Sequence, residues 1–234
     1  MATLFLIPTP LNEDALQVIP AYVHDITHRL RIFIVENERT ARRYLRKSGF
    51  TTSFDDVTLL PLDVDTTPEQ FAQYMSYFKD NAEIGLMSEA GLPAIADPGS
   101  VIVSMCHQRN IPVIPLSGPS SILLALMSSG LNGQQFTFHG YIPVKQPERK
   151  NYLQLMESRA IKGESQICIE TPYRNNQLLQ DILQSCQPAS VLCIAMDITG
   201  SKEFIRTKSI AEWKKQTPHL EKLPAVFILG RLAV

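Results

Sequence analysis

The chain has 234 residues, of which 44% are hydrophobic and 19% charged, with a formal net charge of −1. This composition is typical of a globular protein with a real core, and the length is sufficient for two small domains. A net charge near zero excludes binding of nucleic acid or membrane through overall charge, so any such partner must be held by a local patch.

In the first half of the chain, short apolar runs alternate with segments of helical periodicity, which predicts α/β layers around a largely parallel sheet. We expect the helix in residues 14–30 to kink or break at Pro20. The predicted strands are residues 4–7, 31–35, 84–87 and 112–115. The predicted helices are residues 14–30, 39–47, 68–81, 101–109 and 120–129.

From about residue 145 the alternation starts again, after a segment with phenylalanine at alternate positions, Phe136 and Phe138. The predicted elements are helices at residues 145–160, 175–183 and 210–216 and strands at residues 166–169, 191–195 and 225–229. We therefore expect two α/β domains with mixed, largely parallel sheets, an N-terminal one of residues 1–116 and a C-terminal one of residues 117–234.

Two loops rich in glycine and proline follow predicted strands, SEAGLPAIADPG at residues 88–99 and SGPSS at residues 117–121. Open α/β sheets bind ligands at the carboxyl ends of their strands, and small residues let the backbone approach a flat ligand. Neither loop has the glycine spacing of a pyrophosphate cradle, which favours a nucleoside ligand without phosphates. Ordinary tight turns are the alternative interpretation.

Five blocks of the chain resemble the tetrapyrrole-methylase superfamily of S-adenosylmethionine-dependent methyltransferases. They are VENER (35–39), SEAGLPAIADPG (88–99), LSGPSS (116–121), FHGYIP (138–143) and ETPYR (170–174), in the order that the superfamily has them. Within it, the chain is most similar to the bacterial 16S ribosomal RNA cytidine 2′-O-ribose methyltransferases. The resemblance implies a homodimer of two-domain chains, with the cofactor, S-adenosyl-L-methionine, folded up in the cleft between the domains.

The matched blocks also imply which residues bind the cofactor. These are Ser88, Glu89, Ala90, Gly91, Pro93, Ile95, Asp97, Ser117, Gly118, Pro119, Ser120, Ser121, Glu170, Thr171 and Pro172. Methyl transfer to a ribose hydroxyl needs removal of its proton, for which a nearby carboxylate is suited. Glu36 is the preferred candidate for this role and Glu89 the second.

The resemblance places RNA against a further set of residues, Pro10, Arg39, Arg42, Arg43, His139 and Arg174. Arg39, Arg42, Arg43 and Arg46 have the spacing of one helix face, which is suited to phosphate binding. A solvated helix face is the alternative, and an ordinary buried or rim histidine is the alternative for His139.

Departures from the family pattern keep three functions open. The opening loop, residues 8–14, has no glycine. A family block that carries two basic residues corresponds here to Met196–Gly200, which has none. The acceptor is then RNA, a tetrapyrrole or another small molecule, or the chain is an inactive nucleoside- or RNA-binding relative.

The four cysteines form no CxxC pair and lie in apolar runs, which indicates buried free thiols of a reducing compartment. His24 and His28 have the spacing of paired metal ligands, but no third ligand is apparent, and we expect no metal site. The N-terminus has no basic segment typical of a signal peptide, and no apolar run reaches the ~18 residues of a membrane span. We therefore expect a cytoplasmic enzyme with no membrane partner.

Overall fold

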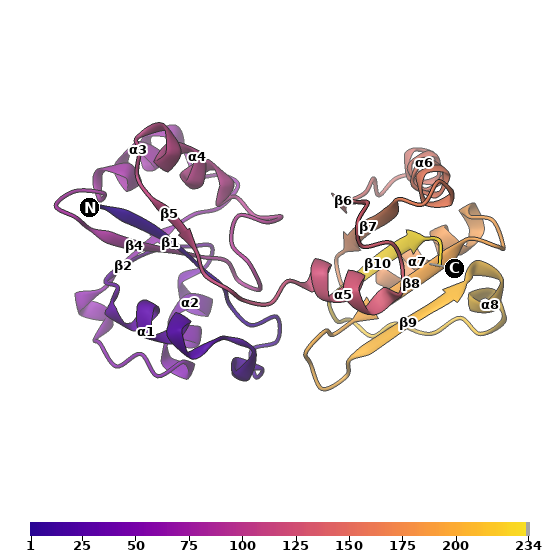
Figure 1. Ribbon diagram of the computed structural model, residues 1–234, viewed down its shortest axis with the longest axis horizontal. Helices are drawn as coiled ribbons and strands as arrows, with labels where there is room; N and C mark the ends of the chain where they lie inside the picture. The colour runs from indigo at the N-terminus through magenta and orange to yellow at the C-terminus, as the bar shows by residue number, and fades with distance from the viewer. Residues whose placement is uncertain (233–234) are drawn as a thin grey trace. The chain divides into compact units, whose positions relative to one another are not determined.

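The computed structural model describes residues 1–232, which divide into two compact units. The first unit is Met1–Ser120, and the second begins at Ser121 (Figure 1). The domain boundary expected after residue 116 lies near this division and stays a prediction. The two units are described separately.

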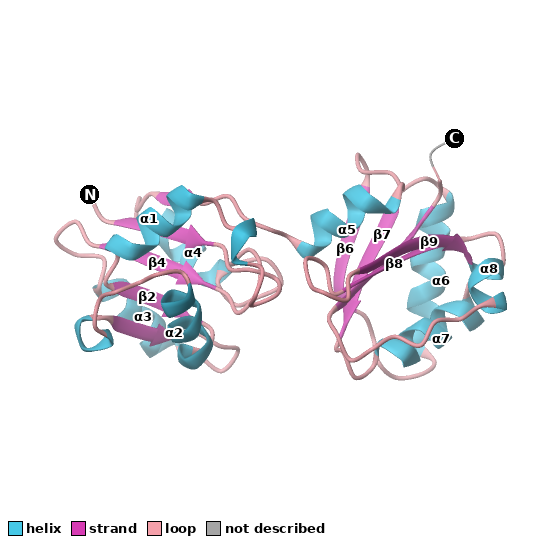
Figure 2. Cartoon of the chain, turned by 90° about the horizontal axis from the view of Figure 1, so that it is seen from below, coloured by secondary structure: helices cyan, strands magenta, loops and turns pink. Residues whose placement is uncertain are grey.

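The first unit is built on a five-stranded sheet in which every pairing is parallel (Figure 2). Its strands are β1 (Thr3–Ile7), β2 (Ile32–Val35), β3 (Thr58–Pro61), β4 (Glu83–Met87) and β5 (Val113–Pro115), in the spatial order β3-β2-β4-β1-β5. Four of these strands were predicted. Strand β3 was not predicted, because its TLLP segment is too short to show an alternation of apolar and polar residues.

Helices cover both faces of this sheet. They are α1 (Ala21–Arg29), α2 (Glu38–Lys47), α3 (Pro68–Ser76) and α4 (Ser100–Gln108), with short 3₁₀ turns η1 (Leu16–Val18) and η2 (Phe54–Asp56). Alternate residues of β1 point to opposite faces, so Phe5 packs in the core beneath α1 and α2 while Leu4 packs in the core beneath α3 and α4. The result is a three-layer α/β/α unit.

Two predicted helices differ in extent from the observed ones. Residues 14–19 are not α-helical, because Pro20 stands in extended backbone and caps the start of α1. Helix α3 begins at Pro68, as predicted, but ends at Ser76 rather than at residue 81. Asp80 and Asn81 adopt the left-handed region, with φ of 50° and 62°, which a right-handed helix does not accommodate.

The second unit has a five-stranded mixed sheet. Its strands are β6 (Phe136–Tyr141), β7 (Ser165–Glu170), β8 (Val191–Met196), β9 (Phe204–Ser209) and β10 (Ala225–Gly230), in the order β6-β7-β10-β8-β9. Only β6 and β7 pair in parallel, and the other three pairings are antiparallel. The predicted α/β fold is confirmed, but the largely parallel pairing expected for both sheets is wrong for this one, since the short connection of residues 197–203 makes β8 and β9 antiparallel. Strand β9 was missed because FIRTKS is a largely polar edge strand.

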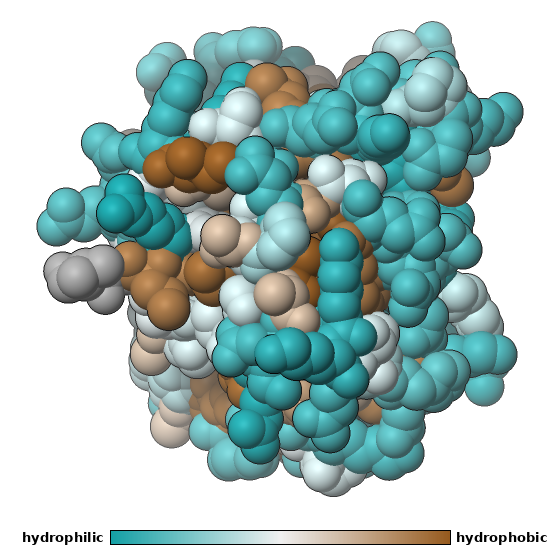
Figure 3. All heavy atoms as spheres, turned by 90° about the vertical axis from the view of Figure 1, so that its right-hand side faces the viewer, coloured by the Kyte–Doolittle hydropathy of each residue, from teal (hydrophilic) through white to brown (hydrophobic). Residues whose placement is uncertain are grey.

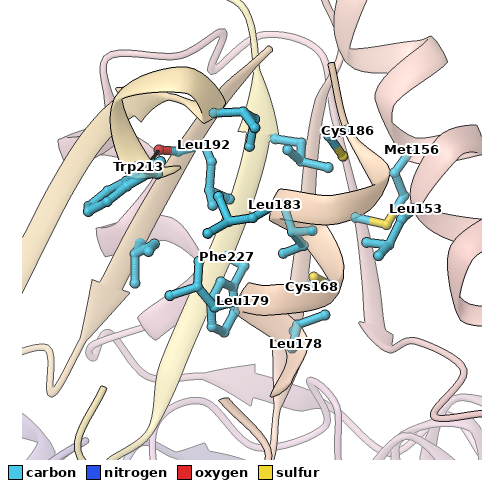
Figure 4. Packing of buried hydrophobic residues seen from close by; sticks show 14 of the residues in the cluster. Leu153, Met156, Cys168, Leu178, Leu179, Leu183, Cys186, Leu192, Trp213 and Phe227 are labelled. Atoms are coloured by element: carbon cyan, nitrogen blue, oxygen red, sulfur yellow. Dashed lines mark hydrogen bonds between the residues drawn. The ribbon is translucent and has the colours of Figure 1, made fainter. Parts of the chain in front are cut away.

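One face of this second sheet is covered by α5 (Ser121–Ser129), and the other by α6 (Glu148–Ile161), α7 (Asn175–Ser185) and α8 (Ile210–Lys215). Leu179 and Phe227 meet in the core beneath α7, and the buried Trp213 donates from Nε1 to the carbonyl of Leu192 at 2.9 Å (Figure 4). Polar side chains cover most of the face of this unit that Figure 3 shows, with smaller apolar areas between them. Within residues 1–232, no helix is long and apolar enough to cross a membrane.

Candidate active site

The carboxyl ends of the parallel strands in the first unit share one edge of the sheet. Residues Pro8 to Pro10 follow β1, Glu36 follows β2, Ser88 follows β4 and Ser117 comes shortly after β5. Chains leaving β1 and β2 pass to helices on one face, whereas the chain leaving β4 passes to α4 on the other. Loops that diverge in this way leave a crevice at the strand ends, where open α/β sheets bind ligands.

The loop after β4 is fixed to the loop after β1 by a short antiparallel bridge. The N–H of Thr9 donates to the carbonyl of Gly91 at 2.9 Å, and the N–H of Gly91 donates to the carbonyl of Thr9 at 3.1 Å. The Thr9 hydroxyl also donates to the carbonyl of Ser88 at 3.3 Å. Gly91 has φ of 82°, which a residue with a Cβ rarely adopts, so glycine is required at this turn.

The turn at residues 117–119 packs against the same β1 loop. A Cβ placed on Gly118 would lie 2.1 Å from Cβ of Pro8, so only glycine permits this approach. A Cβ placed on Gly91 would lie 3.5 Å from the carbonyl oxygen of Pro119. The structure therefore brings the two glycine-containing turns together at one edge of the first unit.

The distal part of the β4 loop has a strained backbone. Ala94 and Ala96 adopt the left-handed region, with φ of 65° and 63°, which costs about 1–3 kcal/mol for each residue. The Asp97 carboxylate stabilises this conformation by accepting from the N–H groups of Ala94 at 2.7 Å and Gly99 at 2.9 Å. The side chain of Asp97 is thus occupied within the loop, while Ile95 at its tip is 48% exposed.

The two predicted catalytic carboxylates are neighbours across β2 and β4. A carboxylate oxygen of Glu36 accepts from the N–H of Glu89 at 3.2 Å, and Glu89 accepts from the Thr40 hydroxyl at 3.1 Å. Desolvation raises the pKa of Glu36, and the negative charges of Glu89 and Asp97 raise it further, against the effect of the Glu89 N–H. A carboxylate with a raised pKa is the stronger base.

The predicted arginine stripe on α2 is divided among different partners. Arg42 bonds to Glu38 at 3.2 Å, and the guanidinium groups of Arg42 and Arg46 lie 5.2 and 4.4 Å from the centroid of the Phe54 ring. Arg39 is exposed, and its guanidinium makes no hydrogen bond or ion pair with another described residue. For Arg42 and Arg46 the structure therefore shows intramolecular contacts, whereas Arg39 remains available.

A pocket of about 240 Å³ lies between the β1 loop, α2 and the start of the β4 loop. Helix α2 lines it with Thr40, Arg43, Tyr44 and Lys47, and the β4 loop contributes Glu89. Arg43 and Glu89 were predicted as site residues, whereas Thr40, Tyr44 and Lys47 were not. Their spacing on α2 places them on the same helix face as Arg43, which is the signal that could have found them.

In the second unit, Glu170 is enclosed by its own neighbours. One carboxylate oxygen accepts from Arg149 at 2.7 Å, and the other accepts from Arg174 at 2.7 Å and from the N–H of Thr171 at 2.8 Å. Arg149 is fully buried and also bonds to Asp181 at 3.0 Å. Burial alone would raise the pKa of Glu170, but the bonds from Arg174, Thr171 and Arg149 together lower it.

The other predicted site residues of the second unit lie on three different elements: His139 on β6, Pro172 after β7 and Ser121 at the start of α5. His139 is half-buried, and its ring nitrogens lie 2.9 Å from the Tyr152 hydroxyl and 2.8 Å from Oε1 of Gln166, which favours a structural role. Pro172 is half-buried just beyond β7, and Ser121 begins α5. Arg149, which organises this region most, was missed because its partners are distant in sequence.

The four cysteines are free and buried, as predicted. Burial raises the pKa of the Cys168 thiol to about 12. Among residues 1–232, no group of three or more histidine, cysteine, aspartate or glutamate side chains is arranged to hold a metal ion.

Comparison with known proteins relates this geometry to a family. The chain is 30% identical over 213 residues to ribosomal RNA small subunit methyltransferase I of Vibrio cholerae, covering 89% of the chain and 69% of that protein. The chain belongs to the ribosomal RNA small subunit methyltransferase I family. Proteins of the same name from Buchnera aphidicola and Haemophilus influenzae are 26% and 27% identical, with 97% of the chain covered and 78% and 77% of those proteins. No protein-family model matches the chain.

Solved structures of methyltransferases share the fold of this family member. The methyltransferase CobJ matches with a TM-score of 0.65 and 14% identity, over 100% of the chain and 95% of CobJ. Uroporphyrin-III C-methyltransferase from Thermus thermophilus matches with a TM-score of 0.59 and 13% identity, over 99% of the chain and 93% of that enzyme. The predicted tetrapyrrole-methylase-like fold is confirmed.

Proposed function

We propose that this protein transfers a methyl group from S-adenosylmethionine to ribosomal RNA of the small subunit. The observation that carries the proposal is membership of the family, whose relatives bear that name. The gathering of four strand-end segments at one edge of the first unit supports it, because this is where open α/β sheets bind ligands.

The cofactor is assigned to the two glycine-containing turns. In the β4 loop the bridge of Gly91 to Thr9 and the hold of Asp97 on Ala94 fix the backbone before a ligand arrives. Backbone N–H and C=O groups of such turns can bond to an adenine edge and to ribose hydroxyls. Thr171 and Pro172 of the second unit are further candidates from the matched ETPYR block, and Glu170 holds Thr171 by accepting from its N–H at 2.8 Å.

The chemistry requires removal of a proton from the acceptor. Bound S-adenosylmethionine would supply a methyl group on a positively charged sulfur. Glu36 would accept the proton that the ribose hydroxyl gives up when its oxygen receives the methyl group, and the sulfur would become neutral in the same step. The N–H of Glu89 holds the Glu36 carboxylate in place. The protein must bring the acceptor oxygen and the methyl group within ~3–3.5 Å of each other.

The proposed partner is RNA, with Arg39 as the available cation beside the strand ends and Pro10, Arg42, Arg43, His139 and Arg174 as further candidates. Arg39 stands one turn beyond β2, on the helix that follows Glu36. A homodimer and a cytoplasmic location complete the proposal, and both rest on the resemblance to the family.

The proposal is tested by methyl transfer from S-adenosylmethionine with a tritiated methyl group to small ribosomal subunits that lack the modification. The expected product is labelled ribosomal RNA. After alkaline hydrolysis the label should be found in a dinucleotide, because a 2′-O-methyl group protects the adjacent phosphodiester bond from alkali. Label on a base would refute the ribose assignment. No labelled RNA, together with labelling of a uroporphyrinogen acceptor in a parallel reaction, would refute RNA as the substrate.

A further inference from the structure

The pocket in the first unit contains an anion site that the chain occupies with its own carboxylate. A single carboxylate oxygen of Glu13 lies 3.1 Å from Nε of Arg43 and 3.8 Å from Nζ of Lys47. Both cations line the pocket, and both project from the same face of α2. An oxygen shared by two cations is the arrangement with which proteins hold a phosphate oxygen.

Stability gives little reason for this cluster. The side chains of Arg43 and Glu13 are 55% and 54% exposed, and Lys47 bonds in addition to Asp14, whose side chain is 84% exposed. Exposed ion pairs contribute little to folding, since water competes with them and salt screens them. A ligand phosphate can therefore displace Glu13 with little loss of folding free energy.

The pocket beneath the cations is suited to a sugar and a base. Pro10, Leu11 and Tyr44 supply apolar surface. Burial raises the pKa of Tyr44 to about 12, so this side chain brings no charge to the pocket. On the β4 side, Glu89 lines the same pocket and bonds through its N–H to Glu36, the proposed base. The pocket's volume of about 240 Å³ is below the ~300–1,000 Å³ of pockets for drug-sized ligands, which limits the occupant to a single unit of an RNA chain.

We infer that this pocket binds one nucleotide of the acceptor RNA, with its phosphate between Arg43 and Lys47 in the place of the Glu13 carboxylate. The inference rests on the proposed function and names the subsite by which the acceptor is held. In the free protein, Glu13 and Asp14 compete with RNA for these cations. Removing Glu13 is then expected to favour RNA binding, whereas removing the cations weakens it.

The test measures binding of a fluorescein-labelled single-stranded RNA oligonucleotide to the full chain by anisotropy, at several salt concentrations. Arg43→Gln and Lys47→Gln are each expected to weaken binding several-fold, and each lowers the slope of log K against log salt by about 0.7, the value for one lost phosphate contact. Glu13→Gln is expected to tighten binding several-fold. A merely structural ion pair would give no tightening.

The matched control is Arg109→Gln, which removes the same charge at the other end of the first unit, beyond α4, where the Arg109 guanidinium bonds to the carbonyl of Met105. It is expected to leave affinity nearly unchanged. Circular dichroism melting verifies that each variant is folded.

Unchanged affinity and slope in the double variant R43Q/K47Q, with methyl transfer by the wild type intact, would overturn the subsite and leave the proposed function standing. A wild type that binds S-adenosylmethionine but neither binds nor methylates RNA would overturn both. A double variant that loses S-adenosylmethionine instead of RNA would assign the pocket to the cofactor and overturn the inference.

Discussion

The N–H of Glu89 donates to a carboxylate oxygen of Glu36 at 3.2 Å, which joins the ends of β2 and β4. This bond orients a glutamate whose pKa is raised by desolvation and by nearby carboxylates. Glu36 was chosen from the sequence by its place in the VENER block. The structure adds a physical reason why it suits proton abstraction, since a raised pKa strengthens a carboxylate as a base.

Glu36→Gln is expected to abolish most methyl transfer, by roughly 10²–10⁴-fold for loss of a general base, while leaving affinity for S-adenosylmethionine unchanged. In the wild type, the rate should fall as the pH drops through the raised pKa of Glu36, because only the ionised carboxylate accepts a proton. Rates of transfer between pH 5 and 9 and calorimetry with the cofactor provide the measurement. An unaltered rate in the variant would remove Glu36 from this role.

Glu36 also has a predicted effect on stability. A carboxyl whose pKa is raised in the folded state is stabilising in its protonated form, and this contribution is lost as the pH rises through the folded pKa. At neutral pH the wild type therefore carries a destabilising charge, and Glu36→Gln is expected to raise the melting temperature. If Glu36→Gln melted at a lower temperature than the wild type at pH 7, and at the same temperature at pH 4, the ionised carboxylate would be stabilising, which contradicts the expectation.

Gly118→Ala is expected to destabilise the first unit by about 1–3 kcal/mol, as for overpacking of a close contact, because the new Cβ meets Pro8 at 2.1 Å. Binding of S-adenosylmethionine should weaken as well, since the turn must move. Chemical denaturation and calorimetry measure both effects. Gly133→Ala is the control, because no atom lies within 4 Å of a Cβ at that position; equal behaviour of the two variants would count against the close approach.

Arg149→Leu is expected to destabilise the protein by about 3–5 kcal/mol, because the carboxylates of Glu170 and Asp181 both lose the buried cation that they share. Arg174→Gln removes a partly exposed cation from the same Glu170 and should have a much smaller effect. Urea unfolding compares the two. A loss below about 1 kcal/mol for Arg149→Leu would show that the buried cluster is not required.

The lowered pKa of Glu170 predicts a dependence of stability on acid. A carboxyl with a depressed folded pKa contributes stability above its ordinary pKa, and this contribution is lost as the pH falls through the folded pKa. The difference in unfolding free energy between wild type and Glu170→Gln should therefore shrink in acid. Glu148→Gln, an exposed glutamate of α6, is the control. A difference that stays constant down to pH 2 would contradict the assignment.

Local patterns predicted much of the fold, because apolar runs and helical periods record burial directly. Helix α2 and strands β1 and β4 appeared close to their observed bounds. Elements without such a pattern were missed, such as the polar edge strand β9, or were given the wrong extent, such as α3, which ends at Ser76 before the left-handed backbone of Asp80 and Asn81.

The special geometry of the two loops was predictable where it depends on residue type, as at Gly91 and Gly118. The site was not predictable where it depends on contacts distant in sequence. The pairing of Glu13 with Arg43 and of Arg149 with Glu170 joins residues whose proximity follows only from the folded sheet. The contacts of Arg43 with Glu13 and of Arg46 with the Phe54 ring likewise have no sequence signature.

Calorimetric titration of the purified protein with S-adenosylmethionine tests directly whether the two glycine-containing turns bind the cofactor. The wild type is compared with Gly118→Ala and Gly133→Ala. We expect binding of one cofactor molecule per chain by the wild type and Gly133→Ala and strongly weakened binding by Gly118→Ala. Absence of binding to the folded wild type, or equal binding by all three proteins, would contradict the assignment of the cofactor to the two turns.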